Sequence, residues 1–517
     1  MTEVVIQDRT SGRAPMPAVN VADAVAAWAQ RLPAAPAVIH GDVVVSYRVF
    51  EGMIRRVAAR YAGVGWGPGT VVGVTQAGGA MAQLIAMFAL ARVGAIQVIV
   101  PLDDPPTQRA AIAARCGITA IAGARGGVGL DHLPAVPIDR SWLDDRGDAP
   151  AGVRAPGGDA PWMIVHTSGT TGAPKAAAIT HGMEVGRIVV LPDFFRYSPG
   201  DRLASLVPVD FRVTRSVALK CLSMGGTFVT MPASGTLRQA LDRVERQRID
   251  VLMATPSQLV DLLPDMPADR PLLPHLRVLR TTAGAMPPAM VAEVRRRISP
   301  NLHVDYGTND AGSIAVATPG DLDRHPDTVG RPFPKLEVEI VDDAGQPVPP
   351  DVEGEIRLRG PGVTHGYIGD PDASRRTHRA GWFHPGDRGR IDRDGLLFVT
   401  GRTDDIMNVA GRKVAPAEIE AVLVAHPAVA AVVAFALPSR RDQDVPAAAV
   451  VLREPDADGM ALADALLAHA RQRLGPHAPR YVHVVPSLPR DAVGKISRRV
   501  LAAELQAALD RRTTPSG

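Results

Sequence analysis

Residues 162–177 read WMIVHTSGTTGAPKAA, a short apolar stretch that runs into a loop of glycine and hydroxyl residues. The loop residues are Thr167, Ser168, Gly169, Thr170, Thr171 and Gly172, and Lys175 follows them. Glycines let backbone N–H groups approach a polyanion, hydroxyls donate hydrogen bonds, and a lysine adds positive charge. Two interpretations are open, a phosphate-binding loop and an ordinary Ser/Thr/Gly turn. The lysine does not adjoin the second glycine and no hydroxyl follows it, which disfavours a P-loop hydrolase or kinase.

Around this loop, apolar strands alternate with helical patterns from about residue 160 to 305. Strands are expected at 162–166, 202–207, 226–230, 249–255, 276–281 and 302–306, with helices such as 236–248 and 287–298 between them. This alternation predicts an α/β architecture with a largely parallel sheet. A strand, an amphipathic helix and a second strand are expected over 45–74, and the composition of 145–161 indicates a loop or linker.

The pattern changes after about residue 330. Strands without helices are expected up to 401, at 335–341, 354–360, 389–393 and 396–402, which predicts a small β-subdomain. A compact α+β tail follows residues 401–405. Its expected elements are helix 416–425, strands 429–436 and 446–452, helix 460–473 and a final helix from 498.

Length and composition narrow the class of protein. At 517 residues the chain is too long for one core, and its 46% hydrophobic and 21% charged content fits a soluble globular protein. We see no apolar run of the roughly 18 residues that span a membrane, and no signal-peptide layout at the N-terminus. Cys116 and Cys221 are too few for a disulfide framework or a zinc site, so a reducing cytoplasm is expected. The net charge of +3 and the absence of a long basic run argue against nucleic acid as a partner.

Lysine is rare in this chain, whose basic residues are nearly all arginine. The lysines are Lys175, Lys220, Lys335, Lys413 and Lys495. Three of them fall in glycine-containing motifs, which makes them functional candidates. Lys220 and Lys335 fit the simpler interpretation of surface residues.

Several motifs accompany the glycine loop in a fixed order. They are 306-YGTND-310, 381-GWFHPGD-387, 400-TGRTDDIMNVAGRKVAPAEIE-420 and 489-PRDAVGKISRR-499. With them, nearly the whole chain resembles the AMP-forming adenylating superfamily, which includes acyl-CoA synthetases, nonribosomal adenylation domains and luciferases. The resemblance implies a large N-terminal domain, 1–403, of two doubly wound α/β subdomains plus the small β-subdomain. A small mobile α+β C-terminal domain, 404–517, would follow it.

The resemblance also implies a reaction and its cofactors, ATP, Mg²⁺ and CoA or a phosphopantetheinyl carrier protein. An acid attacks the α-phosphate of ATP to give an acyl-adenylate and pyrophosphate, and a thiol then takes the acyl group. Positive charge and dipoles aimed at the transition state suit this chemistry. No membrane partner is expected.

Roles for single residues follow from the same resemblance. The loop 167–175, with Thr171 and Lys175, would hold the β- and γ-phosphates. Tyr306 would lie against adenine, opposite the backbone of Ala283, Gly284 and Ala285. Asp387 would accept the ribose hydroxyls with support from Arg402, and Lys495 would bridge the acid and the α-phosphate. Asp404 would be the hinge, and Gly411 would line the thiol tunnel because a side chain there would block the pantetheine arm.

Each of these residues also has a structural interpretation. Asp387 could be a turn residue, Arg402 and Asp405 a surface ion pair, and Lys495 a solvated residue before a helix. Taken together and in order, the motifs favour the functional interpretation.

Two motifs depart from the family pattern. In Tyr306-Gly307-Thr308-Asn309-Asp310 the usual Thr and Glu become Asn309 and Asp310. Asp310 keeps a carboxylate for Mg²⁺, one methylene shorter, and Asn309 can still donate to the α-phosphate. Pro385 replaces a common Thr before Asp387, which leaves only a backbone carbonyl role.

The acid pocket departs further. Its expected positions are Phe211, Arg212, Ser257, Thr281, Ala283, Asp305, Ser313 and Ile314. Arg212 falls where amino-acid-activating relatives keep an Asp, and a cation would repel a substrate ammonium. A polar pocket is also a poor binding site for a long alkyl chain, because unpaired polar groups would be buried. A small or polar acid is therefore expected. The alternative is that Arg212 faces solvent or pairs with Asp210 or Asp305.

The leading hypothesis is an acid:CoA ligase. The first alternative is a free-standing ligase that loads a carrier protein. The second is a relative that adenylates a small oxyacid such as nitrite for transfer to an amine, and the third is an inactive nucleotide-binding relative.

Overall fold

The computed structural model of the chain describes residues 5–6, 16–17, 20–75, 79–102, 104–123, 129–138, 156–167, 175–189, 195, 197–232, 235–409, 412–437, 444–454, 459–490 and 496–513. These residues form two compact units. Unit 1 is Met1–Val338 with Leu358–His384, and unit 2 is Glu339–Arg357 with Pro385–Gly517. The boundary predicted between residues 403 and 404 lies inside unit 2. That boundary concerns a motion of the tail, and it stays a prediction.

Unit 1 contains two large sheets and the short β1–β2 pair (Val5–Ile6 and Met16–Pro17). The six-stranded sheet has the order β10-β9-β6-β5-β7-β8, and all its neighbours are parallel except the β9–β10 pair. Its strands are β5 (Val71–Val74), β6 (Ile96–Ile99), β7 (Ala120–Ala122), β8 (Ala135–Val136), β9 (Pro161–Thr167) and β10 (Lys175–Thr180).

The nine-stranded sheet has the order β17-β16-β15-β14-β13-β11-β12-β3-β4 and is parallel from β15 to β3. Its strands are β3 (Pro36–His40), β4 (Val43–Ser46), β11 (Arg202–Ser205), β12 (Thr227–Val229), β13 (Val251–Ala254), β14 (Val278–Thr281), β15 (Leu302–Thr308), β16 (Gly312–Ala317) and β17 (Arg331–Pro332). The expected parallel α/β architecture is confirmed.

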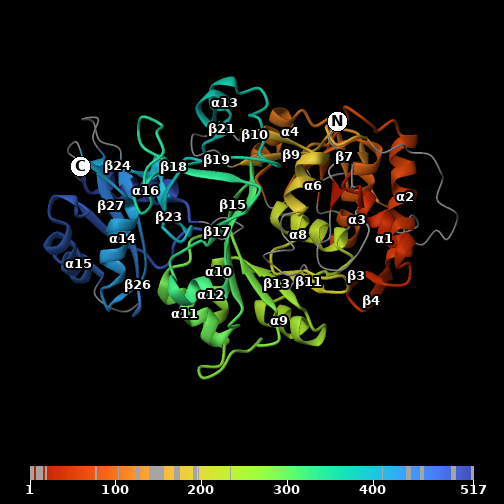
Figure 1. Cartoon of the computed structure of the whole chain (residues 1–517). Helices are drawn as coiled ribbons and strands as arrows, with labels where there is room; N and C mark the ends of the chain where they lie inside the picture. The colour runs from red at the N-terminus through yellow and green to blue at the C-terminus, as the bar shows by residue number, and fades with distance from the viewer. Residues whose placement is uncertain are drawn as a thin grey trace. The chain divides into compact units, whose positions relative to one another are not determined.

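Helices cover both sheets on both faces. A shared core joins the sheets to α1 (Asp23–Arg31), α2 (Tyr47–Gly63), α3 (Gly79–Val93), α6 (His181–Val189) and α8 (Arg212–Ser223). The far face of the nine-stranded sheet packs against α9 (Leu237–Arg246), α10 (Pro256–Leu262), α11 (Pro288–Arg297) and α12 (Pro319–Arg324), and that of the six-stranded sheet against α4 (Pro106–Cys116). Figure 1 shows α1, α2 and α3 side by side and the green helices α10, α11 and α12 grouped together. Unit 1 therefore has the layering of two doubly wound subdomains.

Burial explains the contrast between two neighbouring helices. In α2 the buried residues Tyr47, Phe50, Ile54, Val57 and Tyr61 recur every three or four positions, and the Ser46 side chain caps the helix by accepting from the Val49 N–H. In α3 nearly every described side chain from residue 81 to 93 is buried, because the helix lies within the shared core. A helix enclosed in this way needs no polar face.

Unit 2 holds the tail. β22 (Asp387–Ile391) pairs with β23 (Leu397–Arg402), and the turn Thr403–Asp405 leads to the β24–β25 hairpin (Met407–Val409 and Arg412–Val414). A sheet of β26 (Val429–Leu437), β27 (Val445–Leu452) and β28 (Tyr481–Val484) packs α14 (Pro416–Val424) and α15 (Gly459–Leu474) on one face, and α16 (Arg498–Thr513) on the other. The three helices and strands β26 and β27 match the expected α+β tail, whereas β24, β25 and β28 were not expected.

The region 330–401 corrects one expectation. β18 (Glu337–Val341) and β19 (Gly354–Arg359) are present, as are the short strands β20 (His378–Arg379) and β21 (Trp382–Phe383). Helix α13 (Pro371–Thr377) lies between them, so the prediction of strands without helices was wrong. Asp370 caps α13 by accepting from the Ala373 N–H, and Pro371 at the first helical position suits a helix of only seven residues.

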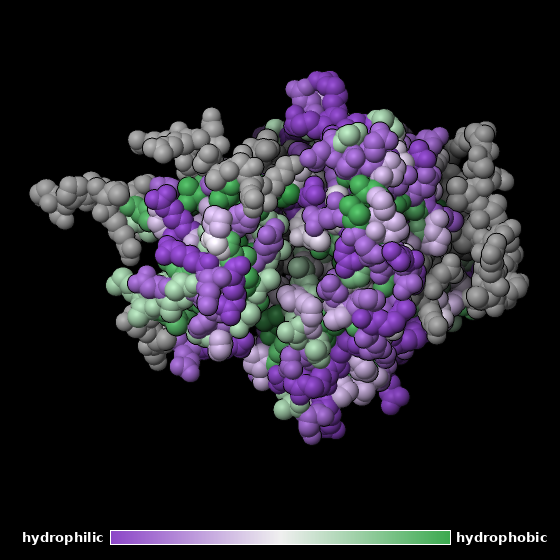
Figure 2. Space-filling model, turned by 60° about the vertical axis from the view of Figure 1, so that its left-hand side comes forward, coloured by the Kyte–Doolittle hydropathy of each residue, from purple (hydrophilic) through white to green (hydrophobic). Residues whose placement is uncertain are grey.

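The described surface is mixed in polarity. Figure 2 shows hydrophilic and hydrophobic residues interspersed on the face that it draws. The exposed large apolar residues are single or paired, as with Val43, Val44 and Met460. Within the described ranges, every helix is too short or too polar to cross a bilayer.

Candidate functional site

Neighbouring parallel strands of the nine-stranded sheet end at one edge, and predicted site residues follow them. Phe211 and Arg212 come after β11, and Ser257 comes after β13. The ends of β14 and β15 carry Thr281, Ala283, Gly284, Ala285, Asp305, Tyr306, Gly307 and Thr308. Ligands of open α/β sheets bind outside the carboxyl ends of the strands. The sheet thus brings most of the predicted adenine and acid residues to the edge where a ligand is expected.

The two ends of the glycine loop are also described. Thr167 closes β9 and Lys175 opens β10, and these two residues are partners across the antiparallel pair. The Asn309 amide approaches the carbonyl oxygen of His166 to 3.5 Å, and the Lys175 Nζ lies 5.4 Å from the centre of the Tyr367 ring. The loop therefore begins beside the YGTND segment and ends across the strand pair from its own start. Ser168, Gly169, Thr170, Thr171 and Gly172 lie outside the described residues.

Backbone geometry explains two small residues of these motifs. A Cβ on Gly307 would lie 2.3 Å from the carbonyl oxygen of Gly312, so only glycine fits where β15 turns into β16. Ala283 has φ +73°, a left-handed conformation that a side chain rarely adopts. Strain of this kind often lies at functional sites.

Arg187 of α6 supports the YGTND turn, a role that no sequence motif indicated. Its Nε donates to the Gly362 carbonyl oxygen at 2.8 Å, and its Nη2 donates to the Asp310 carbonyl oxygen at 2.5 Å. Cβ atoms on Gly312 and Gly362 would come within 3.0 and 2.7 Å of the Arg187 side chain. Burial lowers the pKa of Arg187 to about 10, with Glu184 and Asp310 acting against that shift.

Asp310, the predicted Mg²⁺ ligand, is 5% exposed. Its Oδ1 accepts from the Thr364 hydroxyl at 3.0 Å, and the Thr364 N–H donates to its carbonyl oxygen at 3.0 Å. No group of three or more His, Cys, Asp or Glu side chains suited to a metal occurs among the residues that the structure describes. A single carboxylate still fits Mg²⁺, which proteins usually hold through one or two carboxylates and the phosphates of the substrate.

A buried ion pair links β14 to β15. The Arg280 Nε donates to Asp305 Oδ2 at 2.8 Å, its Nη2 contacts the same oxygen, and Ser313 Oγ donates to it at 3.1 Å. The Arg280 guanidinium also lies 4.9 Å from the centre of the Phe195 ring. Burial opposes the charge on Arg280, but Asp305 and the Tyr197 hydroxyl leave its pKa raised. The predicted residues Asp305 and Ser313 are therefore in contact, joined by an arginine that sequence reasoning missed.

Lys220 and Arg212 require corrections. Lys220 is 4% exposed, so its assignment to the surface was wrong, whereas Lys335 is exposed as expected. The Arg212 side chain is 18% exposed and lies 3.7 Å from Glu184. Asp305 forms its ion pair with Arg280 instead. The structure therefore contains neither a solvent-facing Arg212 side chain nor an ion pair between Arg212 and Asp305. Glu184 was missed because it is a single carboxylate in a short amphipathic helix.

The remaining predicted residues of unit 1 are packed. Thr281 and Ile314 are fully buried, and Ser257 is 8% exposed with its hydroxyl 2.9 Å from that of Thr255. Phe211 is partly buried and immediately precedes α8.

In unit 2, Asp387 and Arg402 face each other across β22 and β23. The Arg402 Nη1 donates to Asp387 Oδ1 at 2.8 Å, and its Nη2 donates to the carbonyl oxygen of Pro385 at 3.1 Å. The backbone carbonyl of Pro385, the only group there for which the sequence left a role, therefore accepts a hydrogen bond. Asp404 lies 3.7 Å from Arg402, whereas Asp405 accepts from Arg498, which corrects the Arg402–Asp405 pair considered from the sequence. Gly411 and Lys495 lie outside the described residues.

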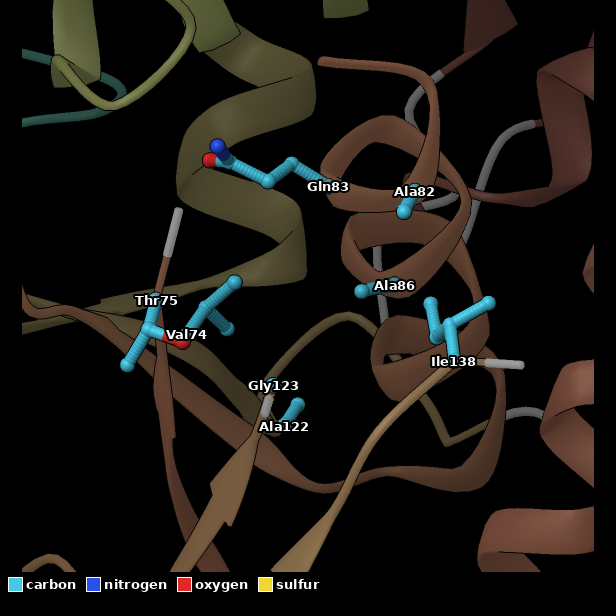
Figure 3. A pocket seen from close by; sticks show the side chains of 8 residues that line it. All are labelled: Val74, Thr75, Ala82, Gln83, Ala86, Ala122, Gly123 and Ile138. Carbon is cyan, nitrogen blue, oxygen red and sulfur yellow. The ribbon is translucent and has the colours of Figure 1, made fainter. Parts of the chain in front are cut away.

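A small cavity of about 10 Å³ lies between α3 and β5, with Thr75 and Gln83 among its lining residues (Figure 3). It has room for about one water molecule. Gln83 also accepts from Arg215 at 2.7 Å and so joins α3 to α8. The cavity is too small for a nucleotide or an organic acid.

Two family models and several known proteins match most of the chain. The family described as AMP-binding enzyme matches residues 25–368, and the AMP-binding enzyme C-terminal domain matches residues 418–495. Indoleacetate–CoA ligase of Aromatoleum aromaticum is 33% identical over 364 residues, 69% of each chain. Oxalate–CoA ligase of Arabidopsis thaliana is 28% identical over 348 residues, 66% of each chain. The structure of the amide bond synthetase McbA from Marinactinospora thermotolerans matches with a TM-score of 0.81 and 25% identity, over 94% of this chain and 99% of the other.

Proposed function

The chain belongs to the AMP-binding enzyme family, and on that premise we propose that it is an ATP-dependent acid:CoA ligase for a small or polar carboxylic acid. The observation that carries the proposal is the meeting of two motifs in unit 1. His166, which precedes the glycine loop, lies beside Asn309, and Lys175 at the end of the loop is paired with Thr167 across β9 and β10. A polyanion held by the loop would therefore reach the YGTND turn.

The proposed reaction gives each of these residues a separate role. The loop 167–175 would hold the β- and γ-phosphates, with Lys175 and Thr171 opposing the charge that develops on the leaving pyrophosphate. Asn309 would donate to the α-phosphate, and Lys495 would draw the substrate carboxylate towards it. Arg187 would hold the Asn309–Asp310 backbone in place for both contacts, since it binds the Asp310 carbonyl oxygen. Mg²⁺, when bound at Asp310, would neutralise charge on the phosphates.

Unit 2 would supply the ribose contact and the second half-reaction. Arg402 orients the Asp387 carboxylate, which would accept from the ribose hydroxyls. We propose that residues 404–517 then rotate about Asp404 and bring Gly411 to the path of the thiol. CoA is the proposed acceptor, with a phosphopantetheinyl carrier protein as the alternative.

The relatives do not identify the acid that this chain would use as its substrate. They are named for indoleacetate and oxalate, which differ in size and charge. One structural neighbour is an amide bond synthetase, so an amine acceptor is a second candidate for the transfer step. An oxyacid such as nitrite is a competing candidate for the substrate, and a catalytically inactive nucleotide-binding protein is the competing candidate for the function.

The test is ATP-dependent pyrophosphate release with a panel of acids, each with and without CoA. The panel should hold benzoates, short and long fatty acids, dicarboxylates, amino acids and nitrite. We expect release with one class of acid and a thioester only when CoA is added. Release without a thioester would point to a carrier protein or an amine acceptor, and no release with any acid would favour the inactive protein.

Lys495→Ala provides the matched test of the active site. We expect pyrophosphate release to fall about 10²–10³-fold, the usual loss when one preorganised transition-state contact is removed. Lys335→Ala removes an exposed lysine and serves as the control. Equal activity of the two variants would contradict the role given to Lys495.

A further inference from the structure

Glu184 of α6 is a buried carboxylate that two arginines share. Its side chain is 2% exposed, and its Oε2 lies 3.5 Å from Arg187 Nη1 and 3.7 Å from Arg212 Nη2. Arg187 lies on the same face of the same helix, whereas Arg212 is the first residue of α8. Both distances exceed the roughly 2.7–2.9 Å of a tight charge-assisted hydrogen bond. One oxygen atom therefore serves two cations and closes fully on neither.

Arg187 connects Glu184 to the YGTND turn. Its Nη2 donates to the carbonyl oxygens of Asp310 at 2.5 Å and of Asn309 at 3.4 Å. Its Nε donates to the Gly362 carbonyl oxygen at 2.8 Å. The guanidinium thus spends Nε and Nη2 on the backbone, and Nη1 is the group that faces Glu184. The carboxylate therefore holds the arginine from the side opposite the turn.

Arg212 occupies a position where a cation needs a nearby anion. The positive end of the helix dipole disfavours a basic side chain at the first residue of α8. Among the residues that the structure describes, Glu184 is the one acid with which Arg212 pairs. The Arg212 Nε is buried and has no hydrogen-bond partner there. Glu184 is therefore the group that stabilises the charge of Arg212 at the carboxyl edge of the sheet.

The two arginines repel each other across this carboxylate. Burial lowers the pKa of Arg187 and the charge of Arg212 lowers it further, whereas Glu184 and Asp310 raise it. If the charge of Glu184 were removed, two guanidinium groups would remain close together in a buried place, where repulsion is stronger than in water. The position of each arginine therefore depends on the same glutamate.

We propose that Glu184 is a positioning residue that couples the acid site to the nucleotide turn, by holding Arg212 at the start of α8 and Arg187 against the Asn309–Asp310 backbone. The proposal rests on the ligase function, which gives Arg212 a place in the acid site and Asn309 a contact to the α-phosphate. Any movement of Arg212 when the acid binds would change the share of Glu184 that is left for Arg187. The two sites would thus be linked through one carboxylate.

The first experiment is the kinetics of Glu184→Gln, which removes the charge and keeps the side-chain volume. We expect the kcat for pyrophosphate release to fall about 10–100-fold and the KM for the acid to rise, because charged contacts are lost at both ends. The KM for ATP should change little, since the proposed phosphate-loop and ribose contacts do not involve Glu184. Glu293→Gln is the matched control, because Glu293 also pairs with two arginines but has a 44% exposed side chain.

A double variant separates positioning from a general loss of stability. Glu184→Gln with Arg212→Gln restores the net charge of the cluster, so Arg187 no longer faces an uncompensated guanidinium. We expect kcat to recover at least about tenfold from its value in Glu184→Gln, while the KM for the acid stays raised because Arg212 is absent. If Glu184→Gln alone folds poorly, the same comparison is made between the double variant and Arg212→Gln, which should then differ in kcat because Glu184 remains beside Arg187 only in the latter.

Hydrogen exchange tests the hold on the turn without any catalysis. The Thr364 N–H donates to the Asp310 carbonyl oxygen that Arg187 also binds, so its exchange should become about tenfold faster or more in Glu184→Gln and stay unchanged in Glu293→Gln.

The outcomes separate the two proposals. Unchanged kinetics of Glu184→Gln in an active enzyme, or equal exchange in all variants, would overturn the role of Glu184 and leave the ligase intact. Faster exchange in Glu184→Gln, with no pyrophosphate release by the wild type for any acid, would support the hold on the turn and overturn the ligase function.

Discussion

Arg498 donates from Nη1 to the Asp405 carboxylate at 2.8 Å, which fastens the start of α16 to the turn that follows β23. Its Nη2 donates to Glu420 of α14 at 3.0 Å, and its Nε donates to the Ala434 carbonyl oxygen at 2.9 Å. Arg498 follows Lys495 by three residues. The segment that carries the predicted catalytic lysine is therefore tied to the tail side of the predicted hinge.

Arg498→Ala should impair adenylation more than ATP binding, because it frees the segment that positions Lys495. Since the Arg498 side chain is 36% exposed, we expect a loss of only about 1 kcal/mol in the free energy of unfolding. The measurements are pyrophosphate release, the Kd for ATP and a denaturation curve. Arg499→Ala, which removes the exposed neighbour, is the control. Identical behaviour of the two variants would remove the positioning role.

Asp387→Asn should raise the KM for ATP about 10–100-fold, because a charged acceptor of the ribose hydroxyls is lost. Arg402→Leu should act in the same direction through the misoriented Asp387, and the double variant should be less than additive because the two side chains are in contact. Asp269→Asn changes an exposed aspartate and serves as the control. Strictly additive effects on the KM would show that Arg402 does not act through Asp387.

Gly307→Ala should disrupt the turn between β15 and β16, since the new Cβ would collide with the carbonyl oxygen of Gly312. We expect a loss of about 2 kcal/mol or more in the free energy of unfolding, together with weaker ATP binding. Gly63→Ala, at the end of α2, adds a Cβ that meets nothing within 4 Å. A Gly307→Ala variant as stable as Gly63→Ala, with unchanged ATP binding, would count against the predicted turn geometry.

His181 should make the fold sensitive to acid. Burial lowers its pKa from 6.5 to about 4, so the folded state favours the neutral imidazole. This contribution is fully present above pH 6.5 and is lost as the pH falls towards 4, because the unfolded chain binds the proton first. The loss is on the order of 3 kcal/mol.

The check for His181 is the free energy of unfolding between pH 7 and 4.5 for the wild type and His181→Asn. The difference between the two should shrink as the pH falls. His275→Asn, at an exposed histidine, should follow the wild type throughout. A pH-independent difference would mean that His181 does not titrate in this way.

The sequence alone predicted many strands and helices over residues 45–74, 160–305 and 401–513, because apolar periodicity is a local property of the chain. It also predicted the motifs at Thr167, Tyr306, Asp387 and Arg402, whose residue types and spacing are local as well. The sequence did not predict the short helix α13, because seven residues give too little periodicity to distinguish a helix from a loop.

Only the tertiary structure decided which of the long basic side chains are buried and what they contact. Lys220, Arg187 and Arg280 have nothing in their own segments that separates a buried cation from a solvated one. Their environment comes from α6, β14, β15 and the segment around Gly362, which are distant in sequence and meet at the edge of the sheet. Whether a charge is buried depends on what surrounds it in space, and only the fold brings those surroundings together.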